Sequence, residues 1–404
     1  MIIHRGLVVD AWGDVGRKLE LHSVRKSMMG ALFGIAADRK EINLDRTLGE
    51  LGIDDGGRLT PAEGGARVRD LLAARSGVYL PAAYADASQS DERPARGSHA
   101  PDTFWFYNNW DFNALGTIYE RLADSSLYES LDRRLAKPLG MQDYTPADGF
   151  LVYEPSGSRY PAHTIRMSAR DLARFGQLFL QDGVWNGTRL ISHDWIVEST
   201  TSKSETGAEG RGYGYLWWTQ RPADLPVYEE VDKRAPFYAS GTGGQFIAVV
   251  PSDDLVVVHR GDTDHGRNVS GRAVWRMFDM ILQARTGNVA SRAGARPMMP
   301  RPLASQLPPV APAKYLALTP AMMTELSGSY EVSPALTVRV FEFEKRLFAN
   351  FPGQGEAELF ALSPLEFTIR VESGVRVVFE RDAAGRVSGF HAAIGSQRFK
   401  AVKR

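Results

Sequence analysis

The sequence predicts an α+β domain over residues 1–286, followed by a linker and a small all-β domain. The segment 23–37 is apolar on nearly every side of a helix, which is typical of a helix buried between other elements. Prolines recur without a period across 287–320, which indicates an extended linker. Beyond residue 326, eight short alternating segments favour a small closed barrel or a sandwich.

Turn chemistry and periodicity place the other elements. A β-hairpin is expected over 1–12 with its turn at Arg5-Gly6, and a second hairpin joins 246–250 to 255–260 through Pro251-Ser252-Asp253-Asp254. The polar segment 80–102 is expected to be a long loop, and such loops are often functional. Helices are predicted over 68–74, 110–122, 126–136, 168–181 and 270–286. The eight C-terminal strands are predicted over 329–332, 336–343, 347–351, 356–362, 366–371, 375–380, 387–392 and 398–402.

The composition excludes several classes of function. The 404 residues include 48 basic and 48 acidic side chains without a basic stripe, so nucleic acid is not expected as a partner. The absence of cysteine removes disulfides, thiol catalysis and cysteine-ligated metals. No apolar run approaches the roughly 20 residues that a transmembrane helix needs. The N-terminus is not a signal peptide as written. These observations leave the compartment open: the chain as written is expected to be soluble and cytoplasmic, and periplasmic or secreted if an upstream segment is missing.

Ser23 and Lys26 stand three residues apart at the start of the predicted buried helix, so their side chains share one face. A serine hydroxyl is a weak nucleophile that needs a neighbouring base. An apolar site disfavours the charged form of lysine, which lowers the pKa of the amine and lets it accept a proton. The backbone N–H groups at a helix N-terminus suit a developing oxyanion. The pair is therefore a candidate nucleophile and base.

Three short stretches follow one another along the chain: Ser23-Val24-Arg25-Lys26, then Tyr107-Asn108-Asn109, then Ser240-Gly241-Thr242-Gly243-Gly244-Gln245, which opens a strand. In this order they resemble the class C β-lactamase and penicillin-binding-protein-like serine hydrolases. That family also includes esterases, D-amino peptidases and 6-aminohexanoate-dimer hydrolases. The segment 168–176 also looks like a family landmark. The resemblance covers residues 1–286, and it is specific to the superfamily rather than to one substrate.

The resemblance implies a role for each matched residue. Ser23 would be the nucleophile. Lys26 would act with Tyr107 as the base, and Tyr107 would also serve the leaving group. The backbone N–H groups of Ser23 and Thr242 would form the oxyanion hole. The substrate-binding residues would be Asn109, Gly241 and Gly243, with Asn109 hydrogen-bonding Lys26 or the substrate.

Each of these residues also has a purely structural interpretation. Tyr107 lies among aromatic residues and could belong to the core. Asn109 could cap the helix that follows it. Gly241 and Gly243 could serve a hairpin turn.

The resemblance also implies an architecture. The domain over 1–286 would have a mainly antiparallel sheet with flanking helices, and an all-helical lobe inserted between about residues 55 and 165. It would be N-terminally short, because family members usually carry a helix and a strand before the first hairpin. The segment 287–320 would be the linker. The segment 321–404 resembles the lipocalin-like accessory barrels attached to this family, which would cover the cleft or mediate association into a homo-oligomer.

The third stretch departs from the family pattern. Family members often have Lys-Thr-Gly or His-Thr-Gly where this chain has Ala239-Ser240-Gly241. The missing cation would normally help to hold a substrate carboxylate. Its absence weakens the β-lactamase and D-Ala-D-Ala carboxypeptidase interpretations, and favours esters or amides without that carboxylate.

The sequence thus predicts a serine hydrolase that cleaves an ester or amide of a small molecule or short peptide through an acyl-enzyme. No metal or cofactor is implied, since Asp262 and His265 resemble metal ligands only superficially and a solvated loop is the simpler interpretation. A D-amino-acid peptidase or a β-lactamase-type activity is the alternative within the class. A catalytically silent, penicillin-binding-like sensor is the alternative from another class. The intact Ser23, Lys26 and Tyr107 argue against a silent protein.

Overall fold

The computed structural model describes residues 1–207, 210–222, 227–284, 314–352, 355–370, 375–394 and 397–404. These residues form two compact units. The first contains the described residues of Met1–Leu80, Asp86–Phe150 and His163–Val310. The second contains Pro81–Ala85, Leu151–Ala162 and the described residues of Ala311–Arg404. The predicted linker lies outside the described residues up to residue 313.

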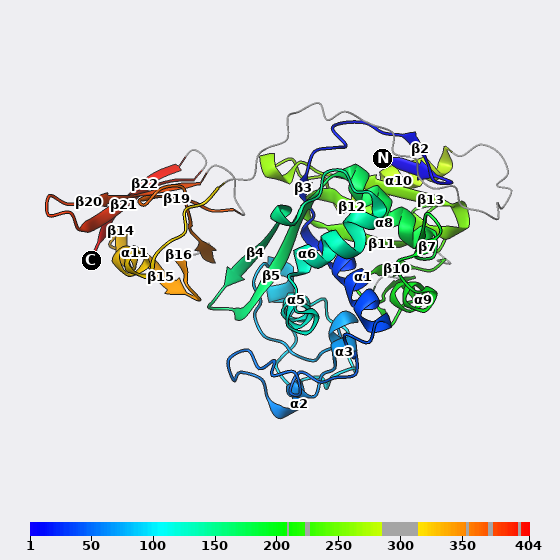
Figure 1. Ribbon diagram of the computed structural model, residues 1–404, viewed down its shortest axis with the longest axis horizontal. Coiled ribbons are helices and arrows are strands. Elements are labelled where there is room, and N and C mark those ends of the chain that lie inside the picture. Colours follow the sequence, from blue (N-terminus) through cyan, green and yellow to red (C-terminus); the bar gives the residue numbers. More distant parts are fainter. Residues whose placement is uncertain (208–209, 223–226, 285–313, 353–354, 371–374, 395–396) are drawn as a thin grey trace. The chain divides into compact units, whose positions relative to one another are not determined.

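An eight-stranded antiparallel sheet organises the first unit (Figure 1), as the fold class predicted. Its strand order is β2-β1-β13-β12-β11-β10-β9-β8. The strands are β1 Ile2–His4, β2 Leu7–Asp10, β8 Ser204–Glu205, β9 Arg211–Tyr213, β10 Trp218–Gln220, β11 Phe237–Gly241, β12 Gln245–Val250 and β13 Leu255–His259. Both predicted hairpins are confirmed, since β1 pairs with β2 and β12 pairs with β13.

Two helices cover opposite faces of this sheet. A Cβ on Gly176 of α8 (Ala169–Leu180) would lie 2.7 Å from atoms of Ile247 and Val256, so α8 packs on the face of the sheet to which these two side chains point. The alternate residues of the same strands, such as Phe246 and Val257, form a core cluster with α10 (Gly271–Gln283). Because successive side chains of a strand point to opposite faces, α8 and α10 sandwich the sheet. Among the described residues, no helix has the length and apolarity needed to cross a membrane.

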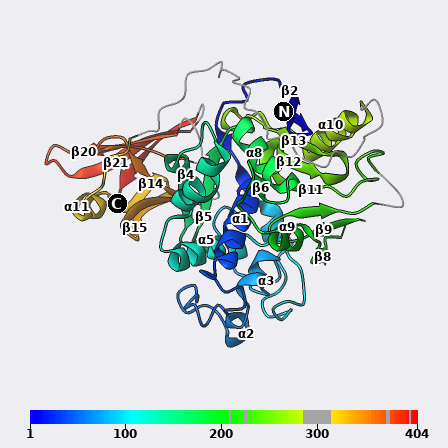
Figure 2. The same ribbon diagram turned by 45° about the vertical axis from the view of Figure 1, so that its right-hand side comes forward.

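The buried helix predicted over 23–37 is α1 (Arg25–Asp38), preceded by the 3₁₀ turn η1 (His22–Val24). Every residue from Arg25 to Ala36 is buried, which confirms the prediction from its all-round apolar surface. Its glycines admit close neighbours. A Cβ at Gly30 would lie 3.3 Å from the Tyr215 carbonyl oxygen, and a Cβ at Gly34 would lie 2.3 Å from the Trp195 ring. Figure 2 shows α1 running between the sheet and the helix α5 (Asn109–Ala123).

The lobe expected to be all-helical between residues 55 and 165 also contains a β-hairpin. The strands β4 (Gly149–Glu154) and β5 (Ser158–Met167) pair there, and β5 also pairs with β3 (Leu19–Glu20). Nearly all of β5 is buried, so it lacks the apolar–polar alternation that would have revealed a strand. The predicted long loop contains the short helix α4. The other helices and strands of the first unit are α2 Pro61–Gly64, α3 Val68–Leu72, α4 Ala87–Asp91, α6 Leu127–Leu131, α7 Lys137–Leu139, α9 His193–Thr200, β6 Val184–Trp185 and β7 Thr188–Arg189.

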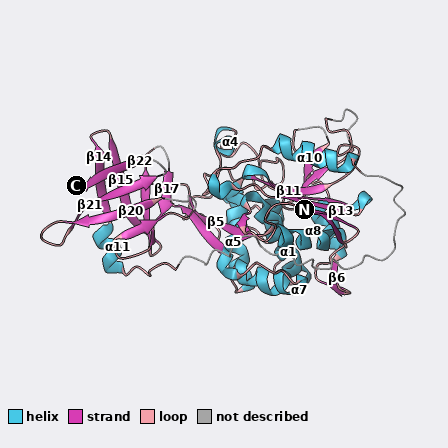
Figure 3. Cartoon of the chain, turned by 90° about the horizontal axis from the view of Figure 1, so that it is seen from above, coloured by secondary structure: helices cyan, strands magenta, loops and turns pink. Residues whose placement is uncertain are grey.

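Apart from Pro81–Ala85 and the segment Leu151–Ala162 of the β4–β5 hairpin, the second unit is a nine-stranded antiparallel sheet with one helix, α11 (Pro320–Leu326). Figure 3 colours its strands magenta and its helix cyan. The strands are β14 Gly328–Ser333, β15 Leu336–Phe343, β16 Arg346–Phe351, β17 Gly355–Glu358, β18 Phe360–Ala361, β19 Glu366–Thr368, β20 Arg376–Arg381, β21 Val387–Ile394 and β22 Gln397–Lys403. The two edge strands, β17 and β18, are separated in sequence by Leu359 alone, so the sheet curls into a nearly closed barrel. The predicted barrel is confirmed, with nine strands rather than eight because the segment 356–362 contributes two.

The close contact between Gly34 and Trp195 predicts how a larger residue at position 34 changes the free energy of unfolding. Alanine at this position would gain about 1 kcal/mol of helix propensity, but its Cβ would overlap the Trp195 ring. Overpacking of a core typically costs about 1–3 kcal/mol. After the gain in helix propensity is subtracted, we expect Gly34→Ala to lower the free energy of unfolding by up to about 2 kcal/mol. Urea unfolding followed by tryptophan fluorescence measures it, since all eight tryptophans lie in the first unit.

Gly64→Ala is the matched control, because a Cβ at Gly64 meets no atom within 4 Å. A stabilised Gly34→Ala variant would contradict the close packing of α1 against Trp195.

Candidate active site

Ser23 and Lys26 come together at the junction of η1 and α1. Strand β3 leads into this turn, and the N–H of Leu21 donates to the Ile165 carbonyl of β5 at 2.9 Å. His22 has a φ of 47°, in the left-handed region that non-glycine residues seldom adopt. One helical turn separates Ser23 from Lys26, and the lysine Nζ donates to the serine Oγ at 2.9 Å. The predicted nucleophile and base are therefore in hydrogen-bond contact.

The Lys26 ammonium is almost completely removed from water. Its side chain is 2% exposed, and Nζ lies 4.4 Å from the ring centre of Tyr107 and 4.6 Å from that of Phe112. Burial lowers the pKa of Lys26 well below its ordinary value, and the neighbouring Arg25 guanidinium lowers it further. The carboxylate of Asp86 opposes this shift. The net shift is toward the neutral amine, the form that can accept a proton.

Tyr107 completes the arrangement from the other side of the lysine. Lys26 Nζ donates to its hydroxyl oxygen at 2.7 Å. The ring stacks on Trp218 with centres 5.3 Å apart and also packs against Phe112. This burial raises the pKa of Tyr107 to about 12, so the phenol remains protonated at neutral pH. Tyr107 is therefore a protonated phenol in hydrogen-bond contact with the Lys26 amine.

A buried polar network fixes the backbone that carries Tyr107. Asn108 is the N-cap of α5, with its side chain accepting from the Trp110 N–H at 3.2 Å. The same side chain donates to Asp111, whose carboxylate accepts from the Ser76 hydroxyl. The capping role considered for Asn109 thus belongs to Asn108. Asn109 is the buried first residue of α5, and its N–H donates to the Gln89 side chain at 3.1 Å.

The glycine-rich stretch closes the site where β11 meets the turn η4 (Thr242–Gly244). A Cβ on Gly241 would lie 2.6 Å from the Leu21 carbonyl oxygen and 3.0 Å from the Ser23 nitrogen. Only glycine lets these two backbones approach so closely, which brings Thr242 next to Ser23. Gly243 has a φ of 73°, a conformation that glycine adopts freely.

One pocket of about 270 Å³ contains most of the predicted site residues. Ser23, Tyr107, Gly241, Thr242 and Gly243 line it, and Lys26 contacts two of them. Asn109 is not among the lining residues. The pocket is also lined by residues for which no role was expected from the sequence: Asp86, Trp218, Ser240, Gly244, Gln245, Phe246, Val269, Gly271, Val274 and Trp275. The aromatic run 211–219 and the long loop 80–102 were the available signals for Trp218 and Asp86.

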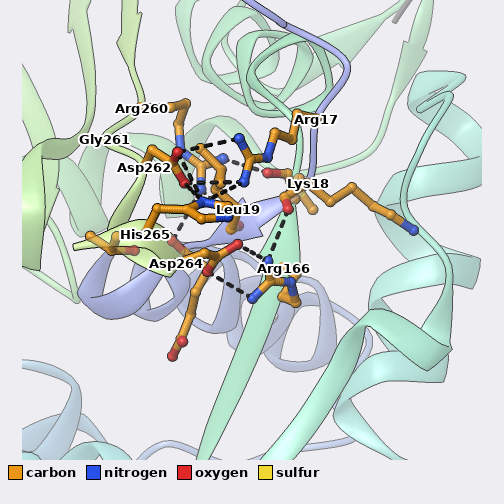
Figure 4. Close-up of polar contacts among 12 residues, drawn as sticks. Arg17, Lys18, Leu19, Arg166, Arg260, Gly261, Asp262, Asp264 and His265 are labelled. Carbon is orange, nitrogen blue, oxygen red and sulfur yellow. Dashed lines mark hydrogen bonds and ion pairs between the residues drawn. The ribbon is translucent and has the colours of Figure 1, made fainter. Parts of the chain in front are cut away.

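A network of charged groups connects the turn η1, which carries Ser23, to the sheet (Figure 4). Arg260, directly after β13, donates to the Leu19 and Glu20 carbonyls at 2.8 and 3.1 Å and to Gln245 Oε1 at 2.7 Å. Burial lowers the pKa of Arg260 to about 9, which still leaves the guanidinium charged at neutral pH. This one side chain therefore joins β3, which enters the Ser23 turn, to the strand that follows the glycine-rich stretch.

Asp262 and His265, considered above as superficial metal ligands, belong to the same network. Nδ1 of His265 lies 2.9 Å from Oδ1 of Asp262, and Arg17 pairs with that carboxylate at 3.1 Å. Arg166 similarly pairs with Asp264. Among the described residues, no group of three or more potential metal ligands occurs. Asp262, Asp264 and His265 instead form ion pairs with one another or with arginines.

Comparisons with known proteins place the chain in a family. A model of the beta-lactamase family matches residues 2–269, more than half of the chain. A 6-aminohexanoate-dimer hydrolase of Paenarthrobacter ureafaciens is 24% identical over 269 residues, which cover 59% of this chain and 64% of that protein. The chain thus spans less than two thirds of the length of this curated relative.

Solved structures show the same fold. The octameric penicillin-binding protein homologue from Pyrococcus abyssi aligns with a TM-score of 0.51 and 15% identity, over 100% of this chain and 94% of that chain. A Bacillus anthracis protein described as a 6-aminohexanoate-dimer hydrolase aligns with a TM-score of 0.51 and 19% identity, over 70% of this chain and 77% of that chain.

The lowered pKa of Lys26 predicts how the reactivity of Ser23 depends on pH. If the neutral amine takes the serine proton, the rate of labelling by a fluorophosphonate rises with pH through the pKa of Lys26 and then levels off. Because burial lowers that pKa, we expect the rising limb well below the ordinary lysine value of 10.5. Intact-mass kinetics across a pH series measure it, with Lys26→Met expected to label slowly and without this limb. A limb near 10.5 would contradict the assignment of Lys26 as a buried base.

Proposed function

The chain belongs to the beta-lactamase family of serine hydrolases, and on this premise we propose that it cleaves an ester or amide through an acyl-enzyme on Ser23. One observation carries the proposal. Lys26 Nζ lies within hydrogen-bond distance of both the Ser23 hydroxyl and the Tyr107 hydroxyl, beside the pocket that both residues line. A nucleophile, a base and a proton carrier in contact are the parts that acyl transfer needs.

In the proposed reaction, Ser23 Oγ attacks the substrate carbonyl while the neutral Lys26 amine accepts the hydroxyl proton. The proton then passes through Tyr107 to the leaving alcohol or amine as the bond between it and the acyl group breaks. Water releases the acyl group by the reverse proton path. The high pKa of Tyr107 supports this role, because a protonated phenol can donate to the leaving group and recover its proton from Lys26.

The oxyanion of the tetrahedral intermediate would be held by the backbone N–H groups of Ser23 and Thr242. The close approach of the two backbones at Gly241 supports this assignment. Each such donor typically contributes about 3 kcal/mol of transition-state stabilisation. Gly241 and Gly243 would border the substrate because both line the pocket, while Asn109 would support Tyr107 from within α5.

The charge of the pocket favours substrates without a carboxylate next to the scissile bond. Asp86 is the one formally charged side chain among the residues that line it. The buried Ala239 stands where relatives often have a lysine or histidine. A substrate carboxylate would therefore meet an acidic group instead of a cation, which supports an esterase- or amidase-like activity over a β-lactamase or a carboxypeptidase. The named activity of the curated relative supports hydrolysis of a small molecule.

The experiment is hydrolysis of p-nitrophenyl acetate by the wild type and by Ser23→Ala. We expect the wild type to turn over the ester and the Ser23→Ala rate to fall by about three orders of magnitude or more, to background, because the nucleophile is lost. Ser98→Ala, at an exposed serine of the same unit, is the matched control and should match the wild type.

Equal hydrolysis by the wild type and Ser23→Ala would refute the assignment of Ser23. A wild type that hydrolyses D-amino-acid amides but not esters would identify the peptidase alternative. A wild type that hydrolyses neither, and that no fluorophosphonate labels, would identify a silent binding protein.

A further inference from the structure

Part of the active-site pocket is lined by an aromatic and aliphatic wall, of which Trp218 is half-buried and the other members are buried. Trp218 from β10, Phe246 from β12 and Trp275 from α10 all line the pocket, together with Val274. Their rings hold one another in place. The ring centres of Phe246 and Trp275 are 5.3 Å apart, and Tyr238 packs against both Trp275 and Trp218 at 4.7 and 6.3 Å. Such interlocked rings form a preshaped apolar surface.

The wall is continuous with the reacting groups. Trp218 stacks on Tyr107, whose hydroxyl contacts Lys26. Ser23, Trp218 and Trp275 line the same pocket, so a substrate bound at Ser23 shares that pocket with the two tryptophans. The pocket volume of about 270 Å³ leaves room for a ring, since a cavity of about 150 Å³ accommodates benzene.

Gly271 is the smallest residue that α10 contributes to this pocket. It is the first residue of α10, directly after the N-cap Ser270, and it lines the pocket. A Cβ at this position would meet no atom within 4 Å, and its φ lies outside the left-handed region. Neither packing nor backbone conformation therefore demands glycine here. Gly271 lines the same pocket as Val274 and Trp275, so the size of the residue at 271 is a variable that the pocket can be tested with.

We infer that this wall is a subsite for an aromatic or branched apolar group next to the scissile bond, and that Gly271 sets the size it accepts. The inference rests on the proposed function, and it names the substrate class as uncharged esters or amides with such a group. The apolar group could belong to the acyl part or to the leaving alcohol or amine, and matched substrates separate these two sources.

The test compares two substrate pairs. p-Nitrophenyl phenylacetate against p-nitrophenyl acetate varies the acyl part, and benzyl acetate against ethyl acetate varies the alcohol. In the wild type we expect kcat/KM to favour the aromatic member of one pair by about tenfold or more, because apolar contact adds to transition-state binding. In Gly271→Leu that ratio should fall by about tenfold, with Gly271→Ala in between.

Arg272→Leu is the control, since this neighbouring side chain is exposed and does not line the pocket. Its ratios should equal those of the wild type. If esters are hydrolysed but neither wild-type ratio favours the aromatic member, or Gly271→Leu leaves both ratios unchanged, the subsite is refuted while the proposed function stands.

Binding without turnover tests the subsite if no ester is hydrolysed. Phenylacetamide and acetamide are titrated calorimetrically into Ser23→Ala and into Ser23→Ala with Gly271→Leu. We expect phenylacetamide to bind about tenfold more tightly than acetamide, and the Gly271→Leu change to remove this difference. Equal binding of the two amides would overturn the inference, whatever the outcome for the hydrolase activity.

Discussion

The burial of the Lys26 side chain is the constraint on which the site depends. A lysine 2% exposed among aromatic rings must either lose its charge or find strong partners. Here the available hydrogen-bond partners are the hydroxyls of Ser23 and Tyr107. The apolar helix α1 supplies the burial, and the Asn108 cap supplies the position of Tyr107. The same packing that stabilises the first unit therefore lowers the pKa of the amine and aligns its partners.

The site also depends on close contact between the turn η1, which carries Ser23, and the glycine-rich stretch. Gly241 lets the β11 backbone touch the backbone of Leu21 and Ser23, and Arg260 ties both strands that enter this region to one buried guanidinium. In the proposed reaction, N–H groups from these two segments would bind one oxyanion, so small shifts between the segments would weaken its binding. The ion pairs around Asp262 and Asp264 hold the loop after β13 in the same place. This explains the density of charge beside an otherwise apolar sheet.

Much of this organisation could be predicted from the sequence, and the failures have physical causes. The all-round apolar pattern of 23–37 identified the buried helix, and the turn residues 251–254 identified a hairpin of the sheet. Strand β5 was not predicted, because burial on both faces removes the alternation of apolar and polar residues that marks a strand. The aromatic run 211–219 marked Trp218 only as part of a strand, and Gly271 and Trp275 carried no local signal. A pocket wall built from β10 and α10 exists only after folding brings these distant segments together.

Detection of the acyl-enzyme tests the central claim most directly. Wild-type protein mixed with p-nitrophenyl acetate is quenched in acid within the first turnover, digested and analysed by mass spectrometry. The account predicts one acetyl group on the peptide that contains Ser23 and none on the corresponding peptide of Ser23→Ala. Turnover without any acylated peptide, or an acetyl group that accumulates on another residue at the rate of turnover, would contradict it.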